Sequence, residues 1–83
     1  MRWRVAEASV TKHGVALADV RHAVAHLVLT KEYDEGPRHK LGGIGFDRRA
    51  DALELVATLL DDGDWLFHHC DYARPSFTRW LMT

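Results

Sequence analysis

Apolar and polar positions alternate with two different periods along this chain, and the change of period separates helical from extended segments. Between residues 16 and 27 the apolar positions recur every three or four residues, which predicts an amphipathic helix; they are Leu17, Val20, Val24 and Leu27. The preceding segment, residues 3–12, has a partial helical face and is expected to form a first helix, although Val5 and Val10 would also suit a strand.

After the second helix the pattern becomes extended and predicts an antiparallel meander of about four strands. The first strand opens at residues 27–30 and ends in a turn at 34–37; the others are expected at 38–46, 52–60 and 65–70. Residues 61–64 have the composition of a hairpin turn between the last two strands. An amphipathic helix is the competing interpretation of 52–60, because Leu53, Val56 and Leu59 also fit a helical period.

Residues 74–81 are expected to form a short last helix, because Pro75 suits the first helical turn. The predicted fold is therefore an α+β domain with two N-terminal helices, a meander sheet of about four strands and a short C-terminal helix. The helices are expected to pack on one face of the sheet. We expect the 83 residues to form one domain, since so short a chain can bury only one core.

Composition and charge exclude several classes of protein. The apolar fraction of 47% is typical of a globular protein, and no apolar run approaches the roughly 18 residues that span a membrane. No secretory signal is recognised, and Cys70 is the single cysteine, so a cytoplasmic protein without disulfides is expected. The net charge of −1 argues against a protein that holds long duplex DNA through many phosphate contacts.

The tetrapeptide Lys12-His13-Gly14-Val15 lies between the two N-terminal apolar segments. Gly14 can adopt the positive φ that ends a helix, and a cation in the last turn suits the helix dipole. A plain helix corner is therefore one interpretation. The other is a site, because a fixed cation beside an imidazole can hold a phosphate and move a proton.

Several short motifs follow one another in an order that is typical of one bacterial family. They are Lys12-His13-Gly14-Val15, Asp19-Val20, Ile44-Gly45-Phe46-Asp47-Arg48, Leu53-Glu54-Leu55-Val56 and Tyr72-Ala73-Arg74-Pro75. In this order the chain resembles the BrnT-like toxins of type II toxin–antitoxin systems, small ribonucleases of the RelE-like superfamily. The resemblance covers roughly residues 10–81. It departs at Asp71, where the family usually has an arginine, and in a last helix whose basic residues are only Arg74 and Arg79.

The resemblance implies a single BrnT-like toxin domain over residues 1–83. Such a protein cleaves RNA in the cytoplasm without a metal or cofactor and arrests translation. A cognate antitoxin holds it inactive in a toxin–antitoxin hetero-oligomer, and no membrane partner is expected.

RNA cleavage without a metal requires a base for the 2′-hydroxyl, an acid for the leaving oxygen, and cations on the phosphate. Imidazoles can move the protons, a carboxylate can act as base, and a guanidinium can grip the phosphate. The candidate catalytic residues are His13, Glu54, His69 and Arg74. The candidate substrate-binding cations are Lys12, Arg48 and Arg49.

Other functions stay open. Asp71 and the weakly basic last helix favour a catalytically degenerate member of the family that binds a partner protein. A DNA-binding module built on two helices and a glycine corner is a third hypothesis. We expect no metal site at His68-His69, because adjacent strand residues point to opposite faces. His22 and His26, four residues apart, could share a metal ion but are interpreted as a solvated helix face.

Overall fold

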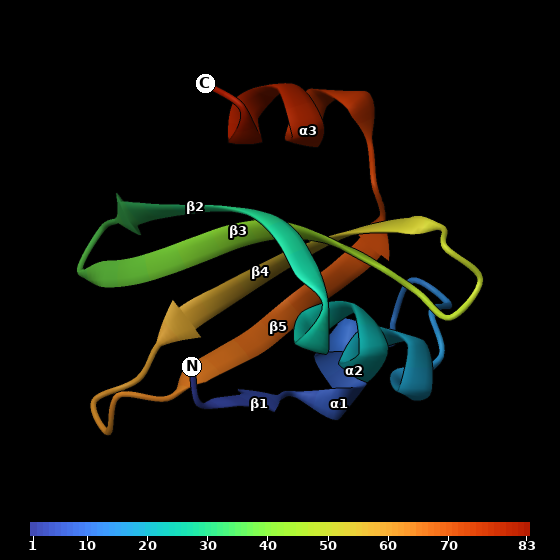
Figure 1. Cartoon of the computed structure of the whole chain (residues 1–83). Helices are drawn as coiled ribbons and strands as arrows, with labels where there is room; N and C mark the ends of the chain where they lie inside the picture. The colour runs from blue at the N-terminus through green and yellow to red at the C-terminus, as the bar shows by residue number, and fades with distance from the viewer.

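The computed structural model describes all 83 residues, and its centre is a five-stranded sheet in the order β1-β5-β4-β3-β2. The strands are β1 (Trp3–Val5), β2 (Leu27–Glu35), β3 (Arg38–Phe46), β4 (Ala52–Leu59) and β5 (Trp65–Tyr72). The helices are α1 (Glu7–Val10), α2 (Leu17–Ala25) and α3 (Pro75–Leu81). Strands β2 to β5 form an antiparallel meander, and β1 pairs in parallel with β5 (Figure 1).

The predicted fold class is wrong at the N-terminus. Instead of a first long helix, the chain opens with strand β1 and continues into α1, a single turn of four residues. The strand forms because it pairs with Trp65–Phe67, and the ring of Trp3 packs edge-on against Phe67 with the ring centroids 6.4 Å apart. The sheet is consequently mixed and five-stranded, rather than a meander of about four strands behind two helices.

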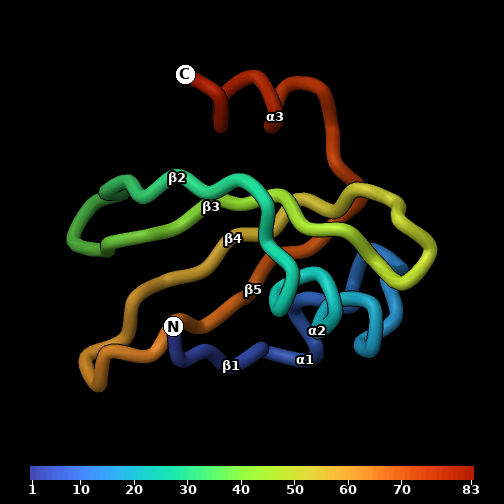
Figure 2. Tube along the Cα trace, in the orientation of Figure 1, coloured from blue at the N-terminus to red at the C-terminus, as the bar shows by residue number.

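The elements from the second helix onward agree with their predicted ranges within a few residues. Helix α2 occupies most of 16–27, and β3 has the predicted bounds. The strand interpretation of 52–60 is confirmed over the helical one, because β4 pairs with β3 on one side and with β5 on the other. Figure 2 shows how the chain passes from β2 to β5 through successive reversals before it enters α3.

The helices lie on both faces of the sheet, which corrects the expectation that they share one. Helices α1 and α2 pack on the face that carries the hydrophobic core, and α3 packs over β2 and β3 on the other (Figure 1). Two glycines of β3 mark these contacts. A side chain at Gly45 would collide with the backbone of Ala23 in α2, and one at Gly42 would collide with the ring of Trp80 in α3.

The core residues come from every element that borders the first face. Those with no exposed surface include Val10, Val20, Leu53, Leu55, Phe67 and Cys70. None of the three helices is long and apolar enough to cross a membrane.

Candidate functional site

A β-bulge in β5 places two consecutive histidines on one face of the sheet. Phe67 pairs with Ala57 and His69 pairs with Val56, so that His68 is an extra residue in the ladder. Phe67 and Cys70 both point into the core, and the two residues between them point to the α3 face. His68 contacts Thr58 there at 2.9 Å, and His69 contacts Glu54. The prediction that the two imidazoles point to opposite faces is therefore wrong.

Glu54 is the centre of a polar cluster on the α3 face. Its side chain has no exposed surface. One carboxylate oxygen accepts the backbone N–H of Arg74 at 2.9 Å and the Nε–H at 3.1 Å. The other oxygen accepts Nη2 of Arg74 at 2.7 Å and lies 2.9 Å from Nε2 of His69. Four contacts satisfy both oxygens, so this carboxylate is buried and fully paired rather than facing solvent.

The charges of this cluster stabilise one another. Burial alone would raise the pKa of Glu54, but the hydrogen bonds from Arg74 and His69 outweigh it and lower the pKa below its ordinary value. The same hydrogen bond and the charge of Glu54 raise the pKa of Arg74. Glu54 is therefore an ionised anchor at neutral pH, and Arg74 keeps its charge.

His13 joins the cluster from the corner between α1 and α2. Its ring lies edge-on to that of His69, with centroids 5.6 Å apart, and its Nδ1 is 3.8 Å from Oδ2 of Asp71. Strand β1 pairs only with the first three residues of β5, so the corner can approach the outer edge of β5 beyond them. Gly14 has φ +88°, and this reverses the chain directly after His13.

The four predicted catalytic residues thus come together, although they belong to three different parts of the chain. The cluster is open to solvent on one side: 38% of the His13 side chain, 25% of His69, 28% of Asp71 and 61% of Arg74 are exposed. Sequence reasoning treated Asp71 only as a departure from a family pattern. Its register position opposite Glu54 indicates that it shares this face, and strand pairing could have revealed this.

The predicted substrate-binding cations are more dispersed. Lys12 is exposed and forms no ion pair, and it lies next to His13 in the chain. Nε of Arg48 donates to Asp19 of α2 at 2.8 Å, which ties the turn after β3 to that helix and lowers the pKa of Asp19. Arg49 lies in the same turn, where its backbone N–H donates to Asp47. No hydrogen bond or ion pair joins Arg48 or Arg49 to the histidine cluster, so only Lys12 is placed beside it by the chain.

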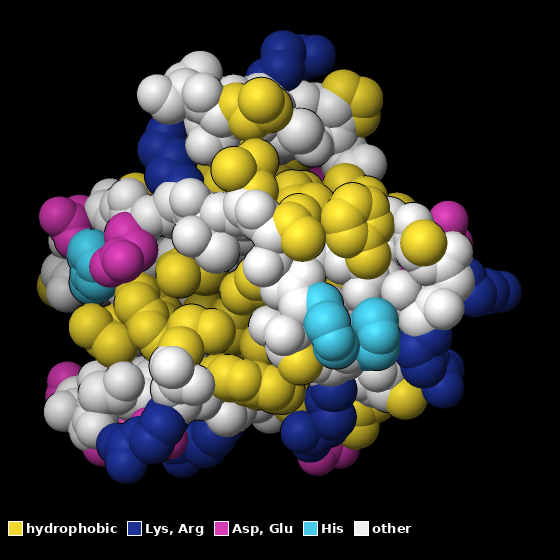
Figure 3. Space-filling model, viewed as in Figure 1, with side chains coloured by type: hydrophobic (Ala, Val, Ile, Leu, Met, Phe, Trp, Pro, Cys, Tyr) yellow, Lys and Arg dark blue, Asp and Glu magenta, His cyan; other side chains and the backbone are white.

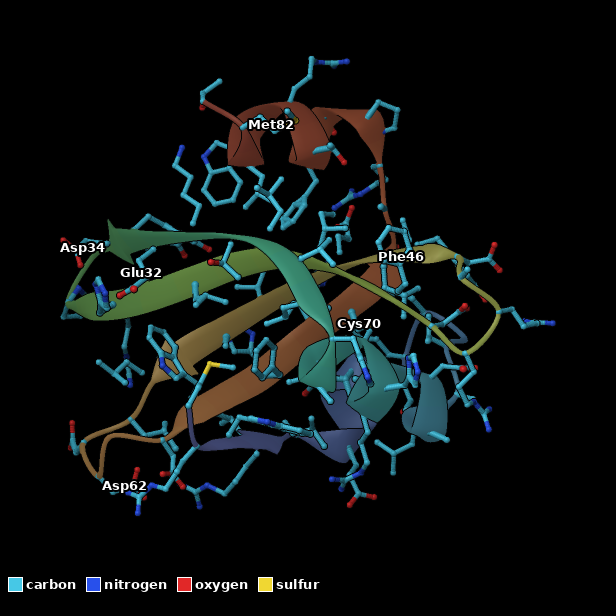
Figure 4. The ribbon with its side chains drawn as sticks, in the orientation of Figure 1. Glu32, Asp34, Phe46, Asp62, Cys70 and Met82 are labelled. Carbon is cyan, nitrogen blue, oxygen red and sulfur yellow. The ribbon has the colours of Figure 1, made fainter.

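A second carboxylate-bound histidine lies at the far end of the β2–β3 hairpin. Nδ1 of His39 contacts Asp34 and Nε2 contacts Glu32, each at 2.7 Å, and these two hydrogen bonds raise the pKa of His39. Figure 4 shows Glu32 and Asp34 at the outer end of this hairpin. Both ring nitrogens of His39 are occupied, which leaves none free to exchange a proton with a substrate.

The cluster of His13, Glu54, His69, Asp71 and Arg74, which we call the histidine cluster, can support acid–base chemistry. In each imidazole one nitrogen faces a carboxylate. The other nitrogen, Nε2 of His13 and Nδ1 of His69, stays free for proton transfer. No group of three or more metal-ligating side chains is arranged to hold a metal ion.

Comparison of the chain with family models, curated proteins and solved structures finds no match.

Proposed function

We propose that this protein is a metal-independent endoribonuclease, acting in the cytoplasm as the toxin of a type II toxin–antitoxin module and neutralised by a cognate antitoxin. The observation that carries the proposal is the contact of two partly exposed imidazoles, His13 and His69, beside an exposed guanidinium. The motif order that resembles BrnT-like toxins adds the biological setting. The single unpaired cysteine agrees with a reducing compartment.

The chemistry needs only groups that the histidine cluster supplies. One imidazole takes the proton of a ribose 2′-hydroxyl, and the resulting oxygen attacks the adjacent phosphorus. The bond from phosphorus to the 5′-oxygen breaks, and the second imidazole gives a proton to that leaving oxygen. The products are a 2′,3′-cyclic phosphate and a free 5′-hydroxyl, so atoms and charge balance without a cofactor.

Glu54 supports this chemistry as an anchor rather than as the base. Both of its oxygens are occupied, and its side chain has no exposed surface, so a substrate hydroxyl cannot reach it. It fixes one nitrogen of His69 and holds the guanidinium of Arg74 in place. Oδ2 of Asp71 faces Nδ1 of His13 at 3.8 Å, beyond hydrogen-bond distance, and this orientation leaves Nε2 of that ring for the proton transfer.

The phosphate would be held by the cations at the rim of the cluster. Glu54 occupies Nε and Nη2 of Arg74, and Nη1 has no protein partner in the structure. Lys12 adds a second positive charge next to His13. An open surface with two cations suits a flexible polymer, because successive phosphates can lie across it.

The proposal is tested with purified protein and a single-stranded RNA oligonucleotide in the presence of EDTA. We expect cleavage that leaves 2′,3′-cyclic phosphate ends, and no cleavage of the same oligonucleotide made of deoxynucleotides. His13→Ala and His69→Ala should each lower the cleavage rate by about 10²–10⁴-fold, the usual contribution of a general acid or base. Induced expression of the wild type should arrest growth, and either variant should relieve the arrest.

The matched control is His39→Ala. His39 lies near the start of β3, whereas the β3 residue that pairs with Glu54 lies near the end of that strand. This variant should cleave RNA at the wild-type rate. Wild-type protein that neither cleaves RNA nor arrests growth would refute the ribonuclease proposal. Equal activity of wild type and His13→Ala would refute the role of the corner imidazole.

A second function, binding of a partner protein without catalysis, is favoured by a different observation. Strand β2 is an edge strand of nine residues, and it carries exposed apolar side chains, with Val28 62% and Leu29 37% exposed. Under this alternative the protein forms a stable complex with a co-expressed antitoxin, and no variant of the histidine cluster changes RNA integrity. Co-purification and the cleavage assay together separate the two functions.

A further inference from the structure

His68 is a histidine of the α3 face that the proposed cleavage does not use. The bulge in β5 turns it to the same face as His69, and bulges often re-aim a side chain next to a functional site. The two rings contact Thr58 and Glu54, which are four residues apart in β4, or about 13 Å along the strand. His68 therefore lies beside the histidine cluster without belonging to it.

The hydroxyl of Thr58 determines which nitrogen of His68 carries the proton. Oγ1 of Thr58 lies 2.9 Å from Nε2 of His68, and Thr58 is buried. The hydroxyl has no other hydrogen-bond partner in the structure, so its proton is satisfied only when it donates to Nε2. Nε2 is then the acceptor, and the proton of the neutral ring is on Nδ1.

Nδ1 of His68 is consequently a hydrogen-bond donor without a protein partner. The residue is half-buried, but Nδ1 itself is not fully enclosed. Burial and the charges of Lys40 and His69 lower the pKa of the ring, which keeps it neutral at pH 7. Lys40 is already engaged, because its Nζ donates to Glu35 at 3.0 Å. The surface beside the histidine cluster thus offers one uncharged and oriented donor.

An uncharged donor suits the edge of a base better than a phosphate. Arg74 and Lys12 already supply the positive charge that a phosphate requires. Proteins recognise single-stranded RNA by hydrogen bonds to the edges of bases that have left the stack. On those edges the keto oxygens of uracil (O4) and guanine (O6) accept, whereas cytosine and adenine carry an amino group, a donor, at the same place.

We propose that Nδ1 of His68 donates a hydrogen bond to the keto oxygen of a uracil or guanine base in a nucleotide beside the scissile phosphate. The assignment rests on the proposed function, and it makes His68 a specificity-determining residue of the same site. It predicts that the protein prefers keto bases to amino bases next to the bond that it cuts.

The histidines outside this face are already engaged and supply a control. Figure 3 shows histidine side chains over α2 and beside acidic side chains at the end of the β2–β3 hairpin. Nδ1 of His22 and Nδ1 of His26 lie on backbone carbonyl oxygens, and both nitrogens of His39 lie on carboxylates. His39→Ala is the matched variant, because it removes an imidazole of β3 that has no free donor.

The first test uses DNA oligonucleotides with a single ribonucleotide, so that only one bond can be cut. The base on each side of this bond is changed in turn from uracil to cytosine and from guanine to adenine. At one of the two sides we expect wild-type kcat/KM to favour the keto base by about 3- to 10-fold, the usual effect of one hydrogen bond. His68→Ala should abolish this ratio, and His39→Ala should keep it.

A second variant tests the support of the ring. Thr58→Val removes the hydroxyl that holds Nε2 of His68, and it should lower the preference for the keto base. The ratio compares two substrates on one protein sample, so a partial loss of folded protein does not change it. A Thr58→Val protein with the full wild-type ratio would contradict the assignment of the proton to Nδ1.

Binding is measured separately from cleavage with 2′-O-methyl oligonucleotides, which lack the hydroxyl that the reaction needs. Fluorescence anisotropy should show that the wild type binds oligouridine about 3- to 10-fold more tightly than oligocytidine. The ring signals of His68 should shift in proton NMR when oligouridine binds. These measurements decide the role of His68 even if the protein cuts no RNA, so its failure is distinguishable from failure of the ribonuclease proposal.

Three results would overturn the proposal while leaving RNA cleavage intact. The first is the same base preference in wild type and His68→Ala. The second is equal binding of oligouridine and oligocytidine by the wild type. The third is a His68→Ala variant that weakens the binding of both oligonucleotides by the same factor, because such a loss indicates a contact with the phosphate backbone.

Discussion

Replacement of Glu54 by Gln tests whether the buried carboxylate anchors the histidine cluster. The substitution keeps the size of the side chain and removes its charge. It replaces one acceptor oxygen with an NH₂ group, which cannot accept the hydrogen bonds from Nη2 of Arg74 at 2.7 Å and Nε2 of His69 at 2.9 Å. The backbone N–H of Arg74 can still donate to the oxygen that remains.

The magnitude follows from these two lost bonds. A hydrogen bond to a charged group contributes about 1.5–3 kcal/mol when its partner is left unsatisfied. The side chains of Arg74 and His69 are 61% and 25% exposed, so water replaces part of each bond. We therefore expect Glu54→Gln to lose about 2 kcal/mol of the free energy of unfolding at pH 7, or about 8–16 °C in Tm for a chain of this size.

The loss should depend on pH. The pKa of Glu54 is lowered in the folded protein, so its contribution to stability is present above the unfolded-state pKa of about 4.3 and is lost as pH falls through the folded-state pKa. Urea unfolding at pH 7 and at pH 3 measures this difference. The stability gap between wild type and Glu54→Gln should be full at pH 7 and smaller at pH 3.

The control for this prediction is Glu7→Gln, which makes the same chemical change at an exposed position. Glu7 has a side chain that is 65% exposed and a single contact of 3.8 Å to Arg21. It should remain within about 0.5 kcal/mol of the wild type at both pH values. The reasoning fails if Glu54→Gln also remains within that range, or if its deficit is the same at pH 3 and pH 7.

Two further predictions test the core on the other face of the sheet. Gly45→Ala should lose at least about 2 kcal/mol of unfolding free energy in urea, because its Cβ would collide with the backbone of Ala23 and α2 would have to move; an unchanged Tm would contradict this packing. Cys70 should resist thiol reagents at pH 8 until the protein unfolds, because burial raises its pKa to about 12; rapid labelling of the native protein would show that the thiol is accessible.

The sequence pattern identifies those elements whose partners are close in the chain. Strands β3, β4 and β5 follow one another through short turns, so alternation and turn composition were enough to place them. Strand β1 has only three residues, and its partner Trp65–Phe67 lies about 60 residues away. A segment so short has no period of its own, and only the parallel pairing decides that it is a strand.

The candidate site shows the same division between local and distant information. The four catalytic residues were predicted from their side-chain chemistry. That they come together in the fold depends on features that the alternation of apolar and polar residues along a strand does not reveal. The bulge at His68 turns His69 to the face of Glu54, and without it the imidazole would point into the core. The short β1 leaves the edge of β5 open to the corner of His13. A strict strand pattern therefore assigned the two adjacent histidines to opposite faces.

The anchor of the histidine cluster is also the anchor of α3. Arg74 is the N-cap of this helix and has no side-chain cap, so its backbone N–H and its guanidinium fasten the start of the helix to Glu54. At the other end Trp80 packs on Gly42 and accepts a hydrogen bond from Lys31 through its carbonyl. Under the proposed function, Nη1 of this guanidinium would bind the phosphate while Nε and Nη2 stay on Glu54. Phosphate binding would then require the docked position of Arg74, so occupancy of the site and docking of the start of α3 would favour each other.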